Sequence, residues 1–403
     1  MPPKSEMATD FSKFSGRLAV VTEIISPYRI PVFNCVSEML GNRFKVFFMT
    51  VTTSSRLWEV PLSRIRFDYE IVKGRVLFES LSGEFPRFWN PNILKALHRF
   101  RPSVIVLGGY HHLTSYAVWW YAKKSGTKLY LWCESNLNDH RSRPFWVEYL
   151  KKAFIRSCDG YIVPGKASLT YLKSYGVDDK NIILAPNAID TELFSTDGSG
   201  QNELIEQERA LFKKERSLPD FNLLFVGRLS PEKGFPTVLE VLERLQGSGL
   251  NVGLIVLGDG PCRSKYETLA MGKRLKHVLF LGFKQPRELP YYYRLGDLLI
   301  MPSTSEPWGL VVNEAMTCGI PVLCSPKVGA AQDLVIEDST GFQCESVEVY
   351  ESHIKELVGD PLKRKGMGKN CREIIKKFTP QACADGFANA FRKVSSLELC
   401  LRK

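Results

Sequence analysis

Two carboxylates eight residues apart, Glu306 and Glu314, have the spacing that points most directly to chemistry. Eight residues make about two turns of an α-helix, so a helix that begins near Gly309 carries Glu314 in its first turns and leaves Glu306 in the preceding loop. The backbone N–H groups of Gly309 and Leu310 then lie at a helix start, where anions bind. Two carboxylates beside an anion site suit a ligand rich in hydroxyls and phosphate, and a nucleotide-sugar is such a ligand.

The stretch around these carboxylates resembles a known motif. Residues 301–335 read MPSTSEPWGLVVNEAMTCGIPVLCSPKVGAAQDLV and resemble the E-x7-E motif of retaining glycosyltransferase family 4, which has the GT-B architecture. The resemblance implies that Glu314 accepts hydrogen bonds from the donor ribose and that Glu306 contacts the transferred sugar near the reacting carbon. It also implies that Gly309 and Leu310 offer N–H groups to phosphate or sugar, and that Gly329 allows close approach to the donor. The alternative is two surface carboxylates that flank a core helix.

Two cations follow a predicted strand in the segment LLFVGRLSPEKGF, residues 223–235. They are Arg228, directly after Gly227, and Lys233. Ligands of open α/β sheets bind where strands end, and a planar guanidinium with a point-charge ammonium suits a diphosphate. The segment resembles the family's Arg and Lys that hold the donor diphosphate and stabilise charge on the leaving group. Two solvated loop charges are the alternative.

Two further segments resemble parts of the family's nucleotide site. VLGDGP, residues 256–261, resembles the turn that lines this site and places Gly258 there. LGFKQPREL, residues 281–289, is expected to contact the base, with Phe283 and Arg287 as candidates. Ordinary core packing is the alternative for Phe283.

The N-terminal half departs from the family pattern. Many members have a Gly-Gly loop after the first strand, but this chain has SPYR, residues 26–29, and Arg29 could supply by its side chain what backbone amides supply elsewhere. The resemblance is therefore close over residues 160–380 and weak over residues 17–160. Donor binding is well supported, and the acceptor side is the part in question.

A second departure concerns a histidine. Many members carry one after the strand that corresponds to LYLW, where this chain has Glu134. Glu134 could orient the acceptor hydroxyl or accept its proton; alternatively, it binds an acceptor hydroxyl or pairs with Arg141 or Arg143. The adjacent His111 and His112 follow the preceding strand and are acceptor-side candidates, with an ordinary loop role as the alternative.

The elements that must position these residues alternate between apolar strands and longer helical patterns, which favours parallel sheets covered on both faces. Strands are predicted at 17–25, 44–51, 67–72, 104–107, 128–132, 160–163, 182–185, 222–227, 252–257, 278–281, 298–301 and 321–324. Helices are predicted at 92–100, 113–124, 144–157 and 167–175. A polar break near 187–220 reads as a linker or peripheral helix.

This alternation predicts an α/β protein with two Rossmann-like domains that face a central cleft. We expect a disordered leader at 1–16, an acceptor-binding domain at 17–188 and a nucleotide-sugar-binding domain at 189–380. The resemblance implies that the C-terminal helix, at 381–403, crosses back to pack on the N-terminal domain.

Composition narrows the class of protein. Of 403 residues, 44% are hydrophobic and 24% charged, which is typical of a soluble globular protein. No apolar run approaches the roughly 18 residues that a membrane span needs, and the N-terminus lacks a signal-peptide core. Ten cysteines without a CxxC pair indicate buried thiols in a reducing compartment. We therefore expect a cytoplasmic protein.

The formal net charge of +11 lies entirely in residues 1–188. A basic half could contact anionic lipid at the inner face of a membrane, a phosphorylated acceptor or nucleic acid; a merely basic surface is the alternative. No nucleic-acid-binding motif accompanies the charge, so we expect no nucleic-acid partner.

The resemblance implies a retaining glycosyltransferase that moves a sugar from a nucleoside-diphosphate-sugar to an acceptor hydroxyl. The acceptor could be a lipid-linked or polysaccharide intermediate or a small metabolite. The resemblance also implies that neither a cofactor nor a bound metal takes part. Two alternatives stay open: a nucleotide-sugar epimerase or hydrolase of the same fold, and a non-catalytic subunit that binds nucleotide-sugar.

Overall fold

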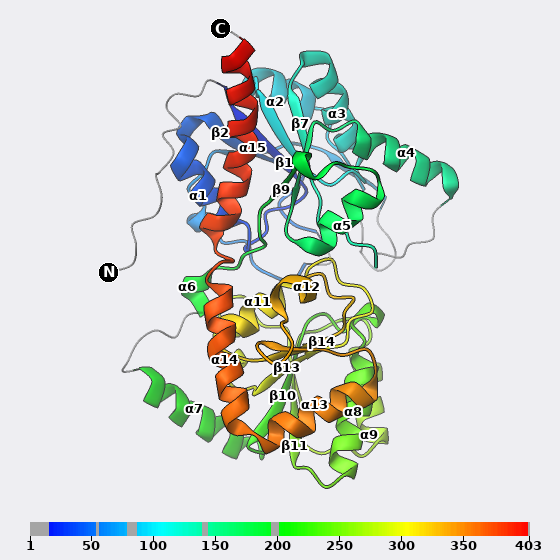
Figure 1. Ribbon diagram of the computed structural model, residues 1–403, viewed down its shortest axis with the longest axis vertical. Coiled ribbons are helices and arrows are strands. Elements are labelled where there is room, and N and C mark those ends of the chain that lie inside the picture. Colours follow the sequence, from blue (N-terminus) through cyan, green and yellow to red (C-terminus); the bar gives the residue numbers. More distant parts are fainter. Residues whose placement is uncertain (1–15, 54–55, 79–86, 139–143, 195–200, 402–403) are drawn as a thin grey trace.

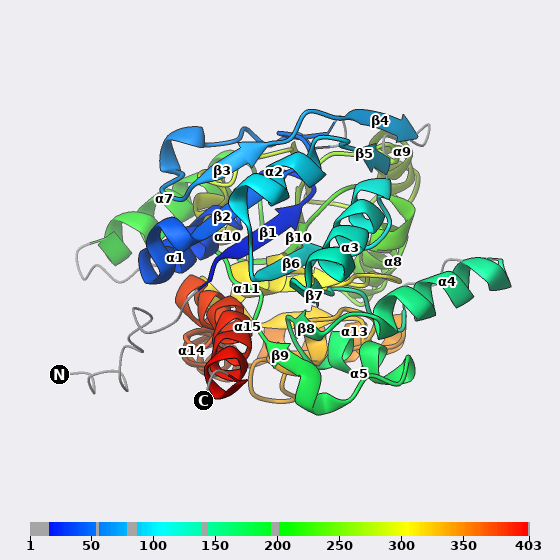
Figure 2. The ribbon, with the colours of Figure 1, turned by 90° about the horizontal axis from the view of Figure 1, so that it is seen from above.

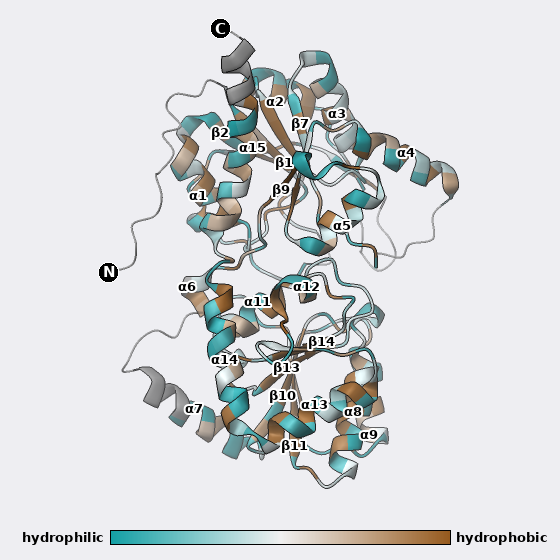
Figure 3. Ribbon diagram, viewed as in Figure 1, coloured by the Kyte–Doolittle hydropathy of each residue, from teal (hydrophilic) through white to brown (hydrophobic). Residues whose placement is uncertain are grey.

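The computed structural model describes residues 16–53, 56–78, 87–138, 144–194 and 201–401. Two parallel β-sheets, each between layers of helices, follow one another along the long axis of the molecule (Figure 1). Their strands are brown in Figure 3 because they are apolar along most of their length. Apart from Gly16, the predicted leader lies outside the described residues.

The first domain is built on a seven-stranded sheet of order β3-β2-β1-β6-β7-β8-β9, in which every pair is parallel. Its strands are β1 (Leu18–Thr22), β2 (Phe44–Phe48), β3 (Tyr69–Ile71), β6 (Val104–Gly108), β7 (Lys128–Trp132), β8 (Gly160–Val163) and β9 (Ile182–Leu184). The sequence predicted all seven. However, β1 ends at Thr22, three residues before the predicted end at Ile25.

Helices cover both faces of this sheet. One face packs against α1 (Ile30–Leu40) and α15 (Pro380–Leu401). The other packs against α2 (Ile93–Phe100), α3 (Leu113–Ser125), α4 (Phe145–Arg156) and α5 (Lys166–Ser174). A small antiparallel pair that was not predicted, β4 (Arg75–Phe78) and β5 (Arg87–Trp89), lies beside this domain. Single 3-10 turns occur at η2 (Gly41–Arg43), η3 (Leu62–Arg64) and η4 (Asp179–Asn181).

The second domain is built on a six-stranded parallel sheet of order β12-β11-β10-β13-β14-β15. Its strands are β10 (Phe221–Val226), β11 (Val252–Leu257), β12 (Val278–Gly282), β13 (Leu298–Met301), β14 (Val322–Cys324) and β15 (Gly341–Gln343), of which only β15 was not predicted. In both sheets the strand order reverses next to the first strand, between β1 and β6 and between β10 and β13. Ligands of such folds bind at this reversal, beyond the carboxyl ends of the strands.

The helices of the second domain also form two layers. One face of the sheet packs against α6 (Thr191–Phe194), α10 (Leu289–Tyr293), α11 (Leu310–Thr317), α12 (Ala331–Leu334) and α14 (Pro361–Ile375). The other packs against α8 (Phe235–Gly247), α9 (Arg263–Gly272) and α13 (Val347–Gly359). The predicted linker contains α7 (Gln201–Glu215), and η5 (Pro231–Lys233) follows β10.

The last helix belongs to the first domain although α14 before it belongs to the second. Phe387 of α15 is fully buried, and its ring centroid lies 5.2 Å from that of Trp132 and 6.0 Å from that of Phe33. Figure 2 shows α15 against the first sheet when the molecule is seen from above. The chain therefore crosses back as the resemblance implies, and the final helix completes the first core.

Among the described residues, no helix combines the length and the apolar character that crossing a bilayer requires.

Candidate active site

Both points of strand-order reversal carry predicted site residues. In the first sheet, the predicted His111 and His112 follow β6, and Glu23, which was not predicted, follows β1. In the second sheet, Gly227 and Arg228 follow β10, and the loop with Glu306 follows β13.

The loop after β13 holds Glu306 firmly. Its backbone forms a parallel bridge with Val328, and its carbonyl oxygen accepts hydrogen bonds from the N–H of Gly329 at 3.0 Å and from Nδ2 of Asn136 at 2.9 Å. Asn136 belongs to the first domain, in the loop after β7. The backbone of Glu306 is therefore fixed by both domains.

The side chain of Glu306 forms an ion pair with the ammonium of Lys233, the last residue of η5. Both side chains are mostly withdrawn from solvent, with 13% and 21% of their surfaces exposed. The N–H of Thr304 donates to the carbonyl of Glu232 at 2.8 Å, which ties the two loops together. Arg228 is half-buried at the end of β10. A predicted carboxylate and the cations predicted to bind diphosphate thus lie together where β10 and β13 of the second sheet end.

Helix α11 begins at Leu310 and has Gly309 as its N-cap residue, as predicted. Gly309 has φ +96°, a left-handed conformation that favours glycine. The fifth residue of the helix, Glu314, is only 1% exposed. Its carboxylate accepts a hydrogen bond from the Tyr293 hydroxyl at 2.5 Å and another from the Tyr28 hydroxyl.

Burial raises the pKa of the Glu314 carboxyl to about 7, although the hydrogen bonds from Tyr293 and Tyr28 oppose the shift. Tyr28 comes from the first domain, in the loop between β1 and α1. The carboxylate that the resemblance assigns to the donor ribose is therefore capped by a hydroxyl of the other domain.

Two predicted glycines are required by contacts within the chain. A Cβ at Gly258, which has φ +140°, would lie 1.9 Å from the carbonyl oxygen of Gly227, so the ends of β10 and β11 pass closely. A Cβ at Gly329 would lie 1.9 Å from the carbonyl oxygen of Pro307. Close packing on its own backbone therefore explains Gly329, and its predicted approach to the donor stays a prediction.

The two candidates for base recognition lie after β12, at the edge of the second sheet. Phe283 is half-buried and Arg287 is exposed. Between them, the side-chain oxygen of Gln285 accepts a hydrogen bond from the N–H of Glu59 in the first domain at 3.1 Å. This segment is thus a contact between the domains.

In the first domain, Arg29 and Glu134 form an ion pair. The Arg29 guanidinium also lies 4.4 Å from the centroid of the Trp132 ring, a cation–π contact. The η1 nitrogen of Arg29 is buried and has no hydrogen-bond partner among the described residues. Two residues that were predicted separately, 105 positions apart, therefore act as one unit. The predicted partners Arg141 and Arg143 lie outside the described residues.

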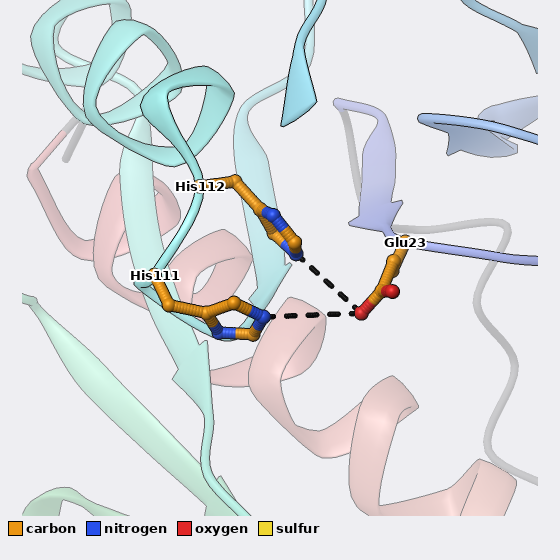
Figure 4. Close-up of side chains that lie close together, drawn as sticks. All are labelled: Glu23, His111 and His112. Carbon is orange, nitrogen blue, oxygen red and sulfur yellow. Dashed lines mark ion pairs between the residues drawn. The ribbon is translucent and has the colours of Figure 1, made fainter. Parts of the chain in front are cut away.

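Figure 4 shows the two histidines converging on Glu23. The carboxylate oxygen Oε2 of Glu23 lies 3.8 Å from Nε2 of His111 and 3.5 Å from Nε2 of His112. Burial raises the pKa of Glu23, but the interactions with the two imidazoles outweigh it and lower the pKa to about 2. Burial lowers the pKa of His112, which is fully buried.

The three side chains are close enough together to hold a metal ion. However, Nδ1 of His112 faces the backbone N–H of Phe88 at 3.3 Å and must accept its hydrogen bond. The proton of the neutral ring is then on Nε2, which directs an N–H rather than a lone pair at Glu23. A metal-binding histidine normally has the opposite arrangement, so His112 is not arranged as a metal ligand and its N–H instead faces the Glu23 carboxylate.

Sequence reasoning missed four residues that the structure brings to these sites: Glu23, Tyr28, Asn136 and Tyr293. Tyr28 lies in the quoted segment SPYR, and Asn136 lies two residues after Glu134, so both are close to predicted residues. Nothing in the sequence indicated that their partners lie in the second domain. Glu23 offered one signal, since a carboxylate directly after a buried strand lies at the ligand-binding edge.

Family profiles match most of the chain. Residues 206–374 match the profile described as glycosyl transferases group 1, and residues 32–193 match the profile described as glycosyltransferase family 4.

Curated relatives align with part of the chain, and two of them serve as examples. A glycosyltransferase of Methanocaldococcus jannaschii is 30% identical over 179 residues, which are 44% of this chain and 49% of that protein. The sulfoquinovosyl transferase SQD2 of Arabidopsis thaliana is 29% identical over 255 residues, which are 61% of this chain and 46% of that protein. The chain thus spans about half the length of the curated relatives it matches.

Among solved structures, HepE of Anabaena in complex with UDP and glucose superposes with a TM-score of 0.68 at 20% identity. The superposition covers 93% of this chain and 99% of that one. At this identity the likeness shows the fold, which is GT-B.

Proposed function

The chain belongs to the family of group 1 and family 4 glycosyltransferases with the GT-B fold, and on this premise we propose that it is a retaining, metal-independent transferase. It moves a sugar from a nucleoside-diphosphate-sugar to an acceptor hydroxyl. The observation that carries the proposal is the ion pair of Lys233 and Glu306 at the strand-reversal edge of the second sheet. A cation for phosphate and a carboxylate for sugar hydroxyls are in contact there, as they must be where a sugar joins a diphosphate.

The donor lies along this edge in our proposal. Glu314 accepts hydrogen bonds from the ribose hydroxyls, which take the place of the Tyr28 hydroxyl. Arg228 and Lys233 hold the diphosphate, with the N–H groups at the start of α11 alongside. The complexes of HepE with UDP and with UDP-glucose support a nucleoside-diphosphate donor of this kind.

In the reaction, the bond between the anomeric carbon and the diphosphate oxygen breaks, and a bond from the acceptor oxygen forms on the same face. The acceptor hydroxyl passes its proton to the departing diphosphate oxygen on that face, and the nucleoside diphosphate leaves toward Arg228 and Lys233. These cations stabilise the charge that develops on the leaving group, which is the main electrostatic task. Glu306 contacts the hydroxyls of the transferred sugar. No metal ion is needed for this division of charge.

The acceptor side is formed by the ion pair of Arg29 and Glu134. The Glu134 carboxylate orients the acceptor hydroxyl by accepting a hydrogen bond from it. The η1 nitrogen of Arg29 is buried and unpartnered among the described residues, so it is a donor that lacks an acceptor. Burial of an unpaired polar group is costly, and an oxygen of the donor phosphate or of the acceptor would satisfy it. His111 lies exposed on this side as a further contact.

The experiment is a thermal-shift panel of nucleoside diphosphates and nucleotide-sugars, with and without Mg²⁺, on the wild type and on Lys233→Ala. A ligand at 100 times its dissociation constant stabilises by about 2.7 kcal/mol. We expect a Mg²⁺-independent shift with one base that Lys233→Ala weakens. No shift with any nucleotide would refute the proposal.

A second assay separates a transferase from the two alternatives. The ligand from the panel is incubated with and without a mixture of hydroxyl acceptors. A transferase releases nucleoside diphosphate much faster with acceptor. An epimerase or hydrolase consumes the donor equally well alone, and a non-catalytic subunit consumes none.

A further inference from the structure

Helix α4 exposes several large apolar side chains to solvent. Phe145 and Tyr149 have 86% and 73% of their surfaces exposed, and Trp146 and Leu150 more than half. Because positions i, i+1, i+4 and i+5 lie on one side of a helix, these four side chains form a single face. Figures 1 and 2 show α4 projecting from the first domain, and Figure 3 colours its outer end brown. Within the described residues, nothing covers this face.

Helix α3 has a similar face. Leu113, Tyr116 and Trp120 are exposed and lie at helical spacing. The two helices are joined side by side, since Tyr116 packs against Phe154 with ring centroids 5.3 Å apart. Nε1 of Trp119 also donates a hydrogen bond to Oγ of Ser157 at 2.7 Å. The inner contacts are thus satisfied, while the outer aromatic and aliphatic side chains are left in water.

Positive side chains outnumber negative ones on the exposed parts of the two helices, where Glu148, with 40% of its side chain exposed, is the one carboxylate. Lys123 and Lys124 are exposed on α3, and Lys152 and Arg156 are exposed on α4. Helix α3 contains no carboxylate. The single carboxylate of α4, Glu148, is bound by Lys151 at 3.1 Å and by the Tyr175 hydroxyl at 3.0 Å.

We propose that the exposed faces of α3 and α4 dock the protein on an anionic lipid bilayer. Tryptophan and tyrosine favour the boundary between headgroups and acyl chains, where their rings are buried and their polar atoms stay hydrated. Lysine and arginine beside them attract anionic headgroups. A second copy of the same surface would bring like charges together. Binding to nucleic acid would not provide an apolar environment for the aliphatic side chains of Leu113 and Leu150.

Helix α3 begins at the acceptor-side candidates, because His112 is its N-cap residue and the exposed His111 comes directly before it. A bilayer under the two helices would therefore present a lipid-borne hydroxyl next to these residues. This last step, which assigns an amphiphilic acceptor, rests on the proposed function, whereas the docking itself does not.

The test is co-sedimentation of the full chain with vesicles of phosphatidylcholine alone or with phosphatidylglycerol. We expect binding to the anionic vesicles that weakens as salt rises from about 0.1 M to about 1 M, because the screening length falls from about 10 Å to about 3 Å. Phe145→Ser combined with Trp146→Ser should weaken it about tenfold by removing apolar contact. Lys124→Glu combined with Lys152→Glu should weaken it by at least about fivefold for each cation lost.

The matched control combines Met271→Ser with Leu362→Ser, which removes two equally exposed apolar side chains from the second domain. This variant should bind like the wild type, and all variants should keep the nucleotide-induced thermal shift. If the wild-type protein does not bind anionic vesicles at low salt, the proposal is wrong. The proposal is also wrong if the variant with Phe145→Ser and Trp146→Ser binds vesicles like the wild type, or if it loses self-association or RNA binding instead. A missing nucleotide shift would count against the proposed function only.

Discussion

The affinity for the donor should rise with pH between pH 6 and pH 8. The cause is Glu314, whose burial raises its carboxyl pKa to about 7. Ribose hydroxyls donate hydrogen bonds, so they bind the ionised carboxylate best. Below the pKa, the donor must first drive a proton off, which costs about 1.4 kcal/mol for each pH unit.

The magnitude follows from the ionised fraction. With a pKa of about 7, roughly one tenth of the Glu314 carboxyls are ionised at pH 6 and roughly nine tenths at pH 8. The dissociation constant should therefore be about tenfold smaller at pH 8, with close to one proton released per donor bound at pH 6. Removing the Tyr28 hydroxyl, which opposes the shift, should move the midpoint above pH 7.

Isothermal titration calorimetry with an intact nucleotide-sugar is the assay, in two buffers of different ionisation enthalpy. An intact nucleotide-sugar is needed because the terminal phosphate of a nucleoside diphosphate titrates near pH 6 and would mimic the effect. Glu314→Gln should bind more weakly at pH 8 and show no pH dependence. A dissociation constant that varies less than about twofold in the wild type, or a dependence that survives in Glu314→Gln, would refute the reasoning.

Three further outcomes are expected. The pKa of Glu314 is raised in the folded chain, so between about pH 4.5 and pH 7 the native state holds an extra proton, and stability falls as pH rises through this window. Glu314→Gln should therefore raise the free energy of unfolding at pH 8 by up to about 3 kcal/mol, as measured by urea denaturation. No gain in stability would contradict the raised pKa. Lys233→Ala should lower kcat/KM at least about 100-fold while Lys233→Arg keeps part of the rate, and equal loss in both would point to a structural role. Phe387→Ala should destabilise the first domain by about 3–5 kcal/mol, against less than about 0.5 for the exposed control Leu362→Ala, as judged by chemical denaturation.

The sheets could be predicted because parallel strands buried on both faces are continuous apolar runs. The antiparallel pair of β4 and β5 was missed because Arg75, Val76 and Leu77 of β4 are exposed and show no alternation of apolar and polar residues. β15 was missed because its residues, Gly341–Gln343, include a single large apolar side chain, Phe342, and so form no apolar run.

The E-x7-E motif predicted the start of α11 well, since Gly309 ends the loop where it should. The pairings of Arg29 with Glu134 and of Tyr28 with Glu314 could not be predicted. Each joins residues that are far apart in the chain, and neither partner's type requires the other. The sequence indicated which edge of each sheet holds the polar residues, but not which of them would meet.

The return of α15 to the first domain has a consequence for how the protein is made. A ribosome releases the first sheet and α1 long before α15 exists, so Phe33 and Trp132 emerge without the helix that covers them. The second domain has all its own strands and α14 by then and can fold first. The domain that is synthesised before the other is therefore completed last, and until α15 leaves the exit tunnel the nascent chain exposes an apolar face that a chaperone can bind.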